Sequence, residues 1–239
     1  MGAVAAWGLS ALINAGLILP VTRVPVLTRS GWWHAWALGT LLGAMLGWRG
    51  WLAVVLYLAL GSAVTKLGFA RKAELGIAEA RGGRRGPENV WGSAATGAAL
   101  ALLSQLPGAP THLLFVGFVA SFAAKLGDTC GSEIGKRWGR TTISLSRLQV
   151  VSPGTEGAVS LEGTLASLVG AAVFSLIGCS LSLVGWELLL PISVIAWLAT
   201  LVESLIGSEL QPQLPWLSNE GVNALMTAIA AAAAMVVLR

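Results

Sequence analysis

The stretch Gly127-Asp128-Thr129-Cys130-Gly131-Ser132-Glu133-Ile134-Gly135-Lys136 follows a hydrophobic run and combines two carboxylates, two hydroxyl groups and a lysine. Its glycines, together with Gly139, recur at every fourth residue, so on a helix they form one bare ridge that lets a second backbone approach closely. The ionisable side chains occupy the neighbouring rows of the same helix. The pattern indicates a helix with one face for packing and another for ions, or else a helix end whose charges only meet water.

The whole chain is strongly apolar. Hydrophobic residues make up 55% of its 239 residues and charged residues only 11%, against about a quarter charged in an ordinary soluble domain. Apolar runs of span length recur along the chain, which predicts a polytopic membrane protein. Each span must pair its own backbone groups in lipid, and the Leu, Ala and Gly content favours helices over barrel strands. We therefore expect an all-α transmembrane helical bundle that forms a single domain over residues 1–239.

Apolar runs bounded by charge, Pro or Gly predict about eight spans. The expected spans are residues 3–19, 32–48, 51–67, 90–106, 112–126, 160–184, 188–206 and 222–238. Only Arg49 and Gly50 separate the second span from the third, so these two should form a tight hairpin. With eight spans, thirteen of the fifteen Lys and Arg residues lie on one side. Because basic loops stay cytoplasmic, both termini should face away from the cytoplasm.

This topology places the polar residues that are costly in lipid at the cytoplasmic ends of the spans. They are Asn89, Asp128, Glu162, Glu203, Asn219 and Asn223. Such groups usually face a cavity or a partner, although Glu203 is also close enough to the interface to reach water. Their convergence predicts one polar site at the cytoplasmic face of the membrane.

Two loops add groups that suit phosphate. In Ser152-Pro153-Gly154-Thr155-Glu156-Gly157 a turn bracketed by glycines leads into the sixth span, where free amide groups favour an anion. A plain helix cap by Thr155 or Ser160 is the alternative for this turn. In the segment 81–89, Arg84 and Arg85 stand on a flexible glycine frame and can clasp phosphate oxygens, although the same charges also act as a topology signal.

Acidic groups beside basic ones at a membrane interface indicate a divalent metal with a phosphorylated ligand. Mg²⁺ prefers one or two carboxylates together with substrate phosphates. The candidate ligands are Asp128, Glu133 and Glu203, with Thr129, Ser132 and Ser204 as further contacts. Phosphoryl transfer also needs cations on the moving charge, and the candidates are Arg84, Arg85, Lys136 and Arg137. The sequence contains no Walker motif, protein-kinase signature, serine nucleophile elbow or nucleic-acid module.

Five groups of residues, in a fixed order, carry a family resemblance from about Gly61 to the C-terminus. They are Gly83-Arg84-Arg85-Gly86 with Asn89, Asp128-Thr129 with Ser132-Glu133-Ile134-Gly135, Pro153-Gly154-Thr155-Glu156-Gly157 with Val159-Ser160 and Gly163-Thr164, Glu203-Ser204 with Gly207 and Gln211, and Asn219 with Val222-Asn223. Together they resemble the integral-membrane family that includes the phytyl-phosphate kinase of the vitamin E pathway. The chain departs from that pattern at Glu203, where Asp is more usual, and at Cys130-Gly131, where an aromatic and then a small residue are more usual.

The resemblance implies phosphoryl transfer from a nucleoside triphosphate, with CTP as the expected donor, to an isoprenoid monophosphate such as phytyl phosphate, giving the diphosphate. A C20 tail worth about 0.8 kcal/mol per buried CH₂ would hold the acceptor in the membrane, so its phosphate would be met at the headgroup level. The resemblance also implies that the matched polar residues bind nucleotide or substrate: Asn89, Thr129, Ser132, Gly154, Thr155, Glu156, Gly157, Ser160, Ser204, Asn219 and Asn223.

The expected partners are therefore membrane lipid, an isoprenoid phosphate and a nucleoside triphosphate, with Mg²⁺ or another divalent cation as cofactor and no nucleic acid. A cyanobacterial protein of this kind would lie in the plasma or thylakoid membrane. Two alternatives stay open at this point. A transporter or flippase for lipid or prenyl phosphate would use the same polar groups as a substrate pathway. A cytidylyltransferase that makes a CDP-lipid would share the metal site and attack a different phosphate.

Overall fold

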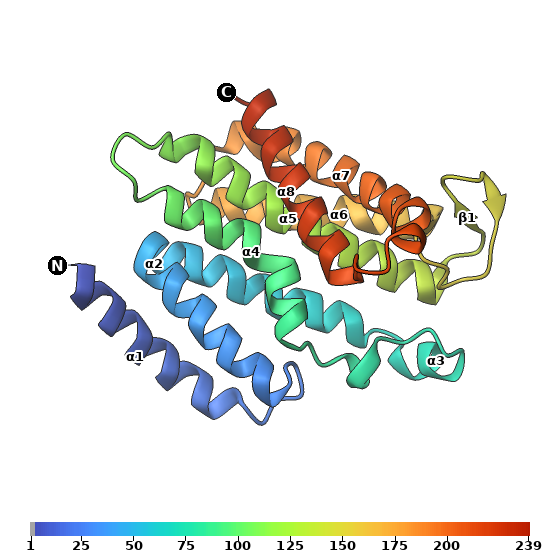
Figure 1. Ribbon diagram of the computed structural model, residues 1–239, viewed down its shortest axis with the longest axis horizontal. Helices are drawn as coiled ribbons and strands as arrows, with labels where there is room; N and C mark the ends of the chain where they lie inside the picture. Colours follow the sequence, from blue (N-terminus) through green and yellow to red (C-terminus); the bar gives the residue numbers. More distant parts are fainter. Residues whose placement is uncertain (1–2) are drawn as a thin grey trace.

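Hydrophobic helices make up most of the computed structural model, which describes residues 3–239. The α-helices are α1 (Ala3–Val21), α2 (Arg29–Lys66), α3 (Phe69–Glu74), α4 (Pro87–Leu103), α5 (Thr111–Trp138), α6 (Leu161–Ser180), α7 (Leu189–Glu209) and α8 (Asn219–Val237). Short 3₁₀ turns occur at η1 (Ala80–Gly83), η2 (Trp186–Leu188) and η3 (Gln211–Gln213). The predicted all-α bundle is confirmed, and Figure 1 shows most of its long helices running side by side.

Helix α2 is a hairpin rather than one long rod. A continuous helix would hold Gly31 and Gly61 about 45 Å apart at 1.5 Å per residue. Both glycines instead lie against Arg85, since a Cβ built on Gly31 would come 2.6 Å from the Arg85 backbone oxygen and one built on Gly61 would come 2.6 Å from its Nη2 atom. The chain reverses at Gly47, whose φ of 65° favours glycine. The predicted hairpin is therefore present, and its turn lies at Gly47 rather than at Arg49 and Gly50.

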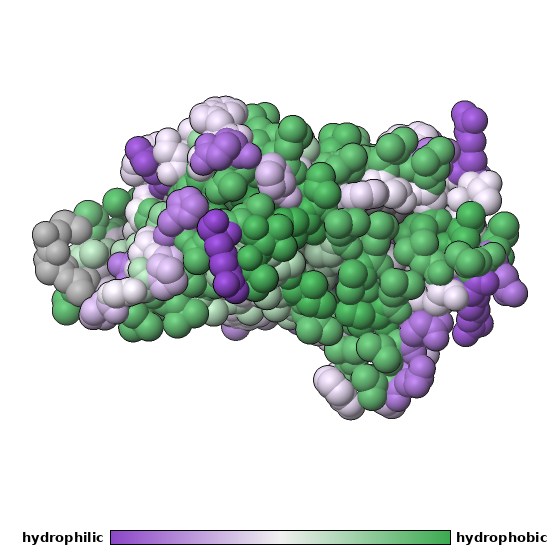
Figure 2. All heavy atoms as spheres, turned by 90° about the horizontal axis from the view of Figure 1, so that it is seen from above, coloured by the Kyte–Doolittle hydropathy of each residue, from purple (hydrophilic) through white to green (hydrophobic). Residues whose placement is uncertain are grey.

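Within residues 3–239, six helical segments are long and apolar enough to cross a membrane. They are Val4–Val21, Arg29–Lys66, Thr111–Trp138, Leu161–Ser180, Trp186–Gln213 and Asn219–Val237. Helix α4, with 17 residues, is shorter than these. Because α2 folds back on itself, the number of segments is not the number of crossings, and the eight crossings and the placement of the termini stay predictions. Figure 2 shows apolar side chains over the middle of the molecule and hydrophilic ones gathered toward the two ends of the view.

Helix α5 forms the centre of the bundle, where it packs against α2, α4, α6, α7 and α8 (Figure 1). Its side chains are buried without interruption from Val116 to Gly127. Aromatic rings lock this helix to its neighbours, with the Phe122 centroid 5.3 Å from that of Tyr57 on α2 and 5.6 Å from that of Phe174 on α6. Helix α1 lies at the edge of the bundle and packs against α2.

The glycine ridge of α5 packs against α6, as the sequence pattern predicts. A Cβ on Gly127 would come 2.9 Å from the Ser167 backbone oxygen, and one on Gly163 of α6 would come 2.7 Å from the Gly131 backbone oxygen. The two backbones are thus in direct contact. This contact runs along the polar half of α5, which continues as a helix to Trp138, beyond the expected end of the membrane span at residue 126.

A small antiparallel sheet, which the all-α expectation did not include, joins α5 to α6. Its strands are β1 (Thr142–Ser144), β2 (Gln149–Val150) and β3 (Ala158–Ser160), in the order β2-β1-β3. The loop between β2 and β3 returns over the end of the bundle. There Gly157, with a φ of 66°, packs so closely on the backbone of α7 at Ser204 and Ser208 that a side chain has no room.

Candidate functional site

A polar cavity of about 340 Å³ lies at one end of the bundle. The loop before α4, at residues 81–86, and the loop before β3, at residues 152–157, both contribute to its lining. Seventeen of the eighteen site residues predicted from the sequence line it. They are Arg84, Arg85, Asn89, Asp128, Thr129, Ser132, Glu133, Lys136, Gly154, Thr155, Glu156, Gly157, Ser160, Glu203, Ser204, Asn219 and Asn223. Residues from α4, α5, α7 and α8 and from both loops, distant in sequence, therefore share one site.

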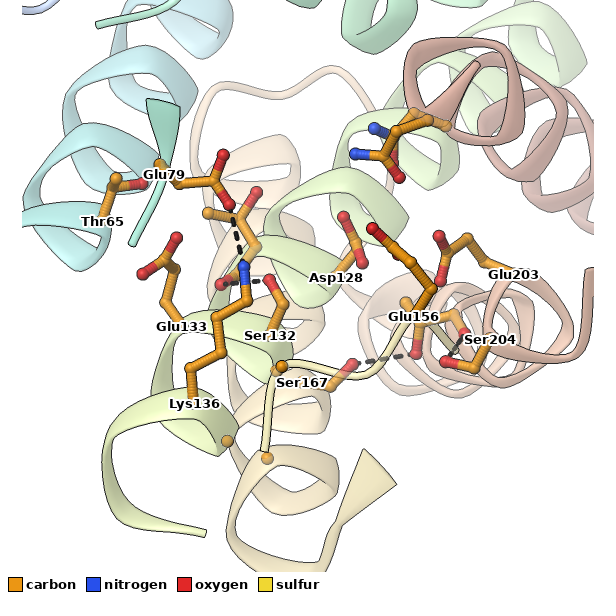
Figure 3. A pocket seen from close by; sticks show the side chains of 18 of the residues that line it. Thr65, Glu79, Asp128, Ser132, Glu133, Lys136, Glu156, Ser167, Glu203 and Ser204 are labelled. Carbon is orange, nitrogen blue, oxygen red and sulfur yellow. Dashed lines mark hydrogen bonds and ion pairs between the residues drawn. The ribbon is translucent and has the colours of Figure 1, made fainter. Parts of the chain in front are cut away.

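Three carboxylates form an acidic cluster on one side of the cavity: Asp128 on α5, Glu156 on the loop before β3 and Glu203 on α7. In Figure 3 these three side chains point toward one another. Asp128 accepts an ion-paired hydrogen bond of 2.5 Å from Lys125, which also donates to Asn223 Oδ1 at 3.0 Å. Within residues 3–239, neither Glu156 nor Glu203 has an ion-pair partner.

The surroundings of Glu156 disfavour the charged form of its carboxyl group. Loss of water beside the cavity wall raises the pKa of this carboxyl above its ordinary value, and the negative charge of Asp128 adds to the effect, while Lys136 opposes it. A carboxylate in this situation gains from a nearby cation. The acidic cluster can therefore accept positive charge from a ligand.

A second group of charges lies on the opposite side of the cavity, around Lys136 and Glu133 of α5 (Figure 3). Lys136 Nζ donates to Glu79 Oε1 at 3.0 Å. Loss of water by itself would raise the pKa of Glu79, but Lys136, with Lys125 and Arg85 further away, lowers it below its ordinary value. Glu133 pairs with Lys72, which is fully buried and also donates to the Thr65 backbone oxygen at 3.0 Å.

The two arginines of the loop before α4 are held differently. Arg85 donates from Nη1 to the Tyr57 hydroxyl at 2.8 Å, and its guanidinium carbon lies 5.4 Å from the centre of that ring. Its backbone is paired with the segment before α2, since Thr28 N donates to Arg85 O at 2.9 Å. Arg84 is exposed and its Nε donates to the Arg81 backbone oxygen at 3.1 Å. One arginine is thus fixed, and the other presents its guanidinium group.

Arg137 is the predicted site residue that does not line the cavity. Its side chain packs against Gly68, and its guanidinium carbon lies 5.0 Å from the centre of the Trp138 ring. The helical period explains this, because Arg137 follows Lys136 by one position and so points about 100° away from it. The structure does not support its predicted contact with phosphate.

Two further expectations need revision. Glu133 lines the cavity, but its carboxylate is occupied by Lys72, so Glu156 replaces it as the third member of the acidic cluster. Ser160 is a helix cap, as one alternative holds: its Oγ accepts from Gly163 N at 3.1 Å and begins α6. Thr155 donates to the Ser152 backbone oxygen at 2.7 Å within its own turn.

The sequence interpretation missed several polar residues of the cavity. They are Thr65, Glu79, Ser93, Lys125, Ser167, Thr200 and Glu220. The sequence does give a signal for Lys125, because a lysine inside an apolar span is costly without a partner. The sequence interpretation uses Lys125 only as one of the basic residues that set the orientation in the membrane. Glu79 lies in a loop, and its role depends on a pairing with α5 that loop composition does not reveal.

The donor set fits a magnesium ion that is completed by substrate. Within residues 3–239, no group of three His, Cys, Asp or Glu side chains is close enough to hold a metal by itself. The cavity does offer the carboxylates of Glu156 and Glu203, which have no ion-pair partner in the described residues, next to Asp128. Mg²⁺ characteristically takes one or two carboxylates and fills its other positions with phosphate oxygens and water.

Comparison with known proteins gives a family and several relatives. The family model described as Integral membrane protein DUF92 matches residues 2–231. The uncharacterized membrane protein sll0875 of Synechocystis sp. is 44% identical over 232 residues, which cover 96% of this chain and 90% of that protein. Protein VTE6, chloroplastic, of Arabidopsis thaliana is 42% identical over 202 residues, covering 82% of this chain and 61% of that protein. The uncharacterized membrane protein MJ0933 of Methanocaldococcus jannaschii is 26% identical over 169 residues, covering 71% and 68%. No solved structure matches.

Proposed function

Because the chain belongs to the integral membrane protein family DUF92, we propose that it transfers a phosphoryl group from a nucleoside triphosphate to an isoprenoid monophosphate such as phytyl phosphate. One observation carries the proposal: a single cavity joins an acidic cluster to arginine and lysine side chains at one end of an apolar bundle. The resemblance of the ordered motifs to the family that includes the phytyl-phosphate kinase points to the same prenyl-phosphate chemistry.

The reaction forms one bond and breaks one bond. An oxygen of the acceptor phosphate attacks the terminal phosphorus of the nucleotide, the bridging bond to the next phosphate breaks, and a nucleoside diphosphate leaves. The acceptor phosphate has a second pKa of about 6 and is already an anion at neutral pH, so no strong base is required. The protein must instead bring two anions together, which calls for positioning and for neutralisation of charge.

The cations of the cavity are placed for that task. Arg84 and Arg85 lie on one loop. Lys125 and Lys136 lie on α5 about three helical turns apart, at the two ends of its polar face. Arg85 is held by Tyr57, so its orientation is set before any phosphate arrives. Preorganised cations of this kind stabilise the charge that shifts during phosphoryl transfer.

The acidic cluster would hold Mg²⁺ through the carboxylates of Glu156 and Glu203, with Asp128 beside them, and substrate phosphate would complete the site. When bound, this ion neutralises charge on the nucleotide phosphates. Asn89, whose amide donates to Glu220 Oε1 at 3.0 Å, and Asn223, which holds Lys125, would orient the polar groups around it. We propose CTP as the donor on the strength of the family resemblance, with the cavity open to the cytoplasm according to the charge distribution of the loops.

The test uses purified full-length protein in lipid nanodiscs with phytyl phosphate, each of the four common ribonucleoside triphosphates and Mg²⁺. The expected product is phytyl diphosphate together with a nucleoside diphosphate, and excess EDTA should stop the reaction. Glu203→Gln should lower the rate by at least about a hundredfold. Glu209→Gln is the matched control, because Glu209 is an exposed glutamate on the same helix and does not line the cavity.

The product distinguishes the competing chemistries. A CDP-lipid with release of pyrophosphate would replace the kinase proposal by nucleotidyl transfer. Movement of prenyl phosphate between leaflets without any new phosphate bond would replace it by transport. An absence of turnover with every triphosphate and with several prenyl phosphates would contradict the proposal.

A further inference from the structure

A second, largely apolar groove lies beside the polar cavity, between α1 and the first turns of α2, and has a volume of about 740 Å³. Its floor and walls include Ala15 and Ile18 of α1 and the rings of Trp32 and Trp36 of α2. This volume falls in the range of about 300 to 1,000 Å³ that is typical of small-molecule sites. The polar cavity does not account for this groove.

The rim of the groove is basic. Arg23, Arg29 and Arg84 line it, and within residues 3–239 no acidic side chain does. An apolar trough with a cationic rim fits a ligand that has a long hydrocarbon chain and an anionic head. A neutral lipid would leave the three guanidinium groups without a counter-charge.

Arg84 lines both the groove and the polar cavity. Next to Arg84 the chain is fixed by a backbone pairing, in which Thr28 N donates to Arg85 O at 2.9 Å and Arg85 N donates to Val26 O at 3.0 Å. Arg85 lines only the polar cavity, while its neighbour Arg84 lines both. A phosphate on Arg84 would be next to the polar cavity while its tail lies in the groove.

The indole groups of the groove add a second observation. Trp36 Nε1 donates to the Ala11 backbone oxygen at 3.1 Å and so helps to hold α1 on α2. In the described part of the chain, Trp32 Nε1 is buried and has no hydrogen-bond partner. Because the protein itself covers that nitrogen, Trp32 offers a ligand in the groove apolar surface rather than a donor.

We propose that this groove holds the hydrocarbon tail of the isoprenoid monophosphate, with its phosphate on Arg84 at the mouth of the polar cavity. The proposal rests on the proposed function for the identity of the acceptor and adds the place where that acceptor binds. Helix α1 is then one wall of a substrate site. It is fastened to α2 by polar contacts inside the apolar region, such as the bond of 2.7 Å from Asn14 Nδ2 to the Trp36 backbone oxygen.

The test measures binding without nucleotide. The full-length protein in nanodiscs is given a C20 isoprenoid monophosphate that carries a diazirine at the far end of its tail, is irradiated, and the labelled peptides are identified by mass spectrometry. Labelling is expected in α1 and in the first turns of α2. Unlabelled C20 monophosphate should compete, and phosphatidylglycerol should not.

Two substitutions on α1 form a matched pair. Ala15→Phe fills the groove and should weaken binding of the C20 monophosphate by about tenfold or more, while a C5 monophosphate binds as before. Leu12→Phe adds the same ring at a position on α1 that is 73% exposed and does not line the groove, so it should change neither affinity. Arg84→Gln should weaken both ligands by about tenfold or more, because the lost interaction is with the head.

Labelling confined to other helices would overturn the proposal, and so would equal competition by phosphatidylglycerol, which would make the groove a general lipid site. If Ala15→Phe does not fold, Ile18→Trp serves instead, since Ile18 also lines the groove and the larger ring should weaken binding of the C20 monophosphate but not of the C5 monophosphate. The outcomes also separate the two proposals. Labelling in the groove without phosphoryl transfer would contradict the proposed function alone, and transfer without such labelling would contradict the tail site alone.

Discussion

The buried ion pair between Lys72 and Glu133 should be one of the strongest single contributions to the stability of the polar end of the bundle. The two side chains have exposed fractions of 0% and 3%, so neither charge can turn to water when its partner is removed. Breaking such a pair from one side characteristically costs about 3 to 5 kcal/mol, because an unpaired charge remains buried. Lys72 also gives up its bond to the Thr65 backbone oxygen when it is replaced.

The two single substitutions should not be equal. Glu133→Leu leaves the Lys72 ammonium buried against a leucine, and we expect the full cost of about 3 to 5 kcal/mol. Lys72→Met leaves the Glu133 carboxylate, which still has Lys136 as a neighbouring cation, so the expected cost is at the lower end of that range. For a chain of this length, such changes correspond to a fall of about 6 to 20 °C in the unfolding midpoint.

The double variant Lys72→Met with Glu133→Leu removes both charges together and should recover most of the lost stability, since apolar pairs often replace buried ion pairs without loss. The assay is thermal unfolding of wild type, both singles and the double in one detergent, followed by intrinsic tryptophan fluorescence. Arg71→Met with Glu74→Leu is the matched control, because this exposed pair on the same short helix should contribute under about 1 kcal/mol. A double variant no more stable than the worse single would refute the reasoning, as would singles that unfold like the wild type.

Three other outcomes are expected. Glu79→Gln and Glu156→Gln should alter the pH dependence of stability in opposite senses when unfolding midpoints are measured across pH. The lowered pKa of Glu79 gives stability that is present above its ordinary value of 4.5 and is lost on acidification. The raised pKa of Glu156 means that stability falls as pH rises above 4.5, and the substitution should remove that fall. Gly163→Ala should destabilise the protein by about 1 to 3 kcal/mol in the same unfolding assay, because the new methyl group meets a backbone oxygen of α5 at 2.7 Å. Gly8→Ala is the control and should be neutral or slightly stabilising, because a methyl group there has no neighbour within 4 Å. Tyr57→Phe should lower the rate of phosphoryl transfer by about tenfold at saturating substrate and should change the unfolding midpoint little. The substitution removes the hydroxyl group that orients Arg85. An unchanged rate would contradict that positioning role.

The sequence predicted most of the fold because the dominant signals are local. Apolar runs identify helices, and the spacing of Gly127, Gly131 and Gly135 predicts close packing that the structure places against α6. The position of the α2 turn is harder, because Gly47 and Gly50 both permit a reversal and only packing decides between them. The strands β1 to β3 have two or three residues each, too few for a visible alternation.

The site was predictable in its membership but not in its pairings. Polar residues that are costly in an apolar chain converge because each needs a partner or water, and that reasoning holds for Asp128 and Glu203. It cannot say which cation meets which anion. Lys72 and Lys125 look alike as topology charges, yet one neutralises Glu133 and the other holds Asp128 beside Asn223. Such pairings depend on the depth and rotation of each helix.

The charge balance of the cavity explains why its acidic and basic groups must act together. Among the residues that the structure describes, six acidic and five basic side chains line it, so these side chains offer no net positive charge to a nucleotide and a prenyl phosphate. Most of its cations are already engaged, with Lys125 on Asp128 and Lys136 on Glu79. Two polyanions can therefore approach each other only if further positive charge enters with them. The acidic cluster, with Glu156 and Glu203 free of ion pairs in the described chain, is the part of the site that gives such a cation a reason to bind.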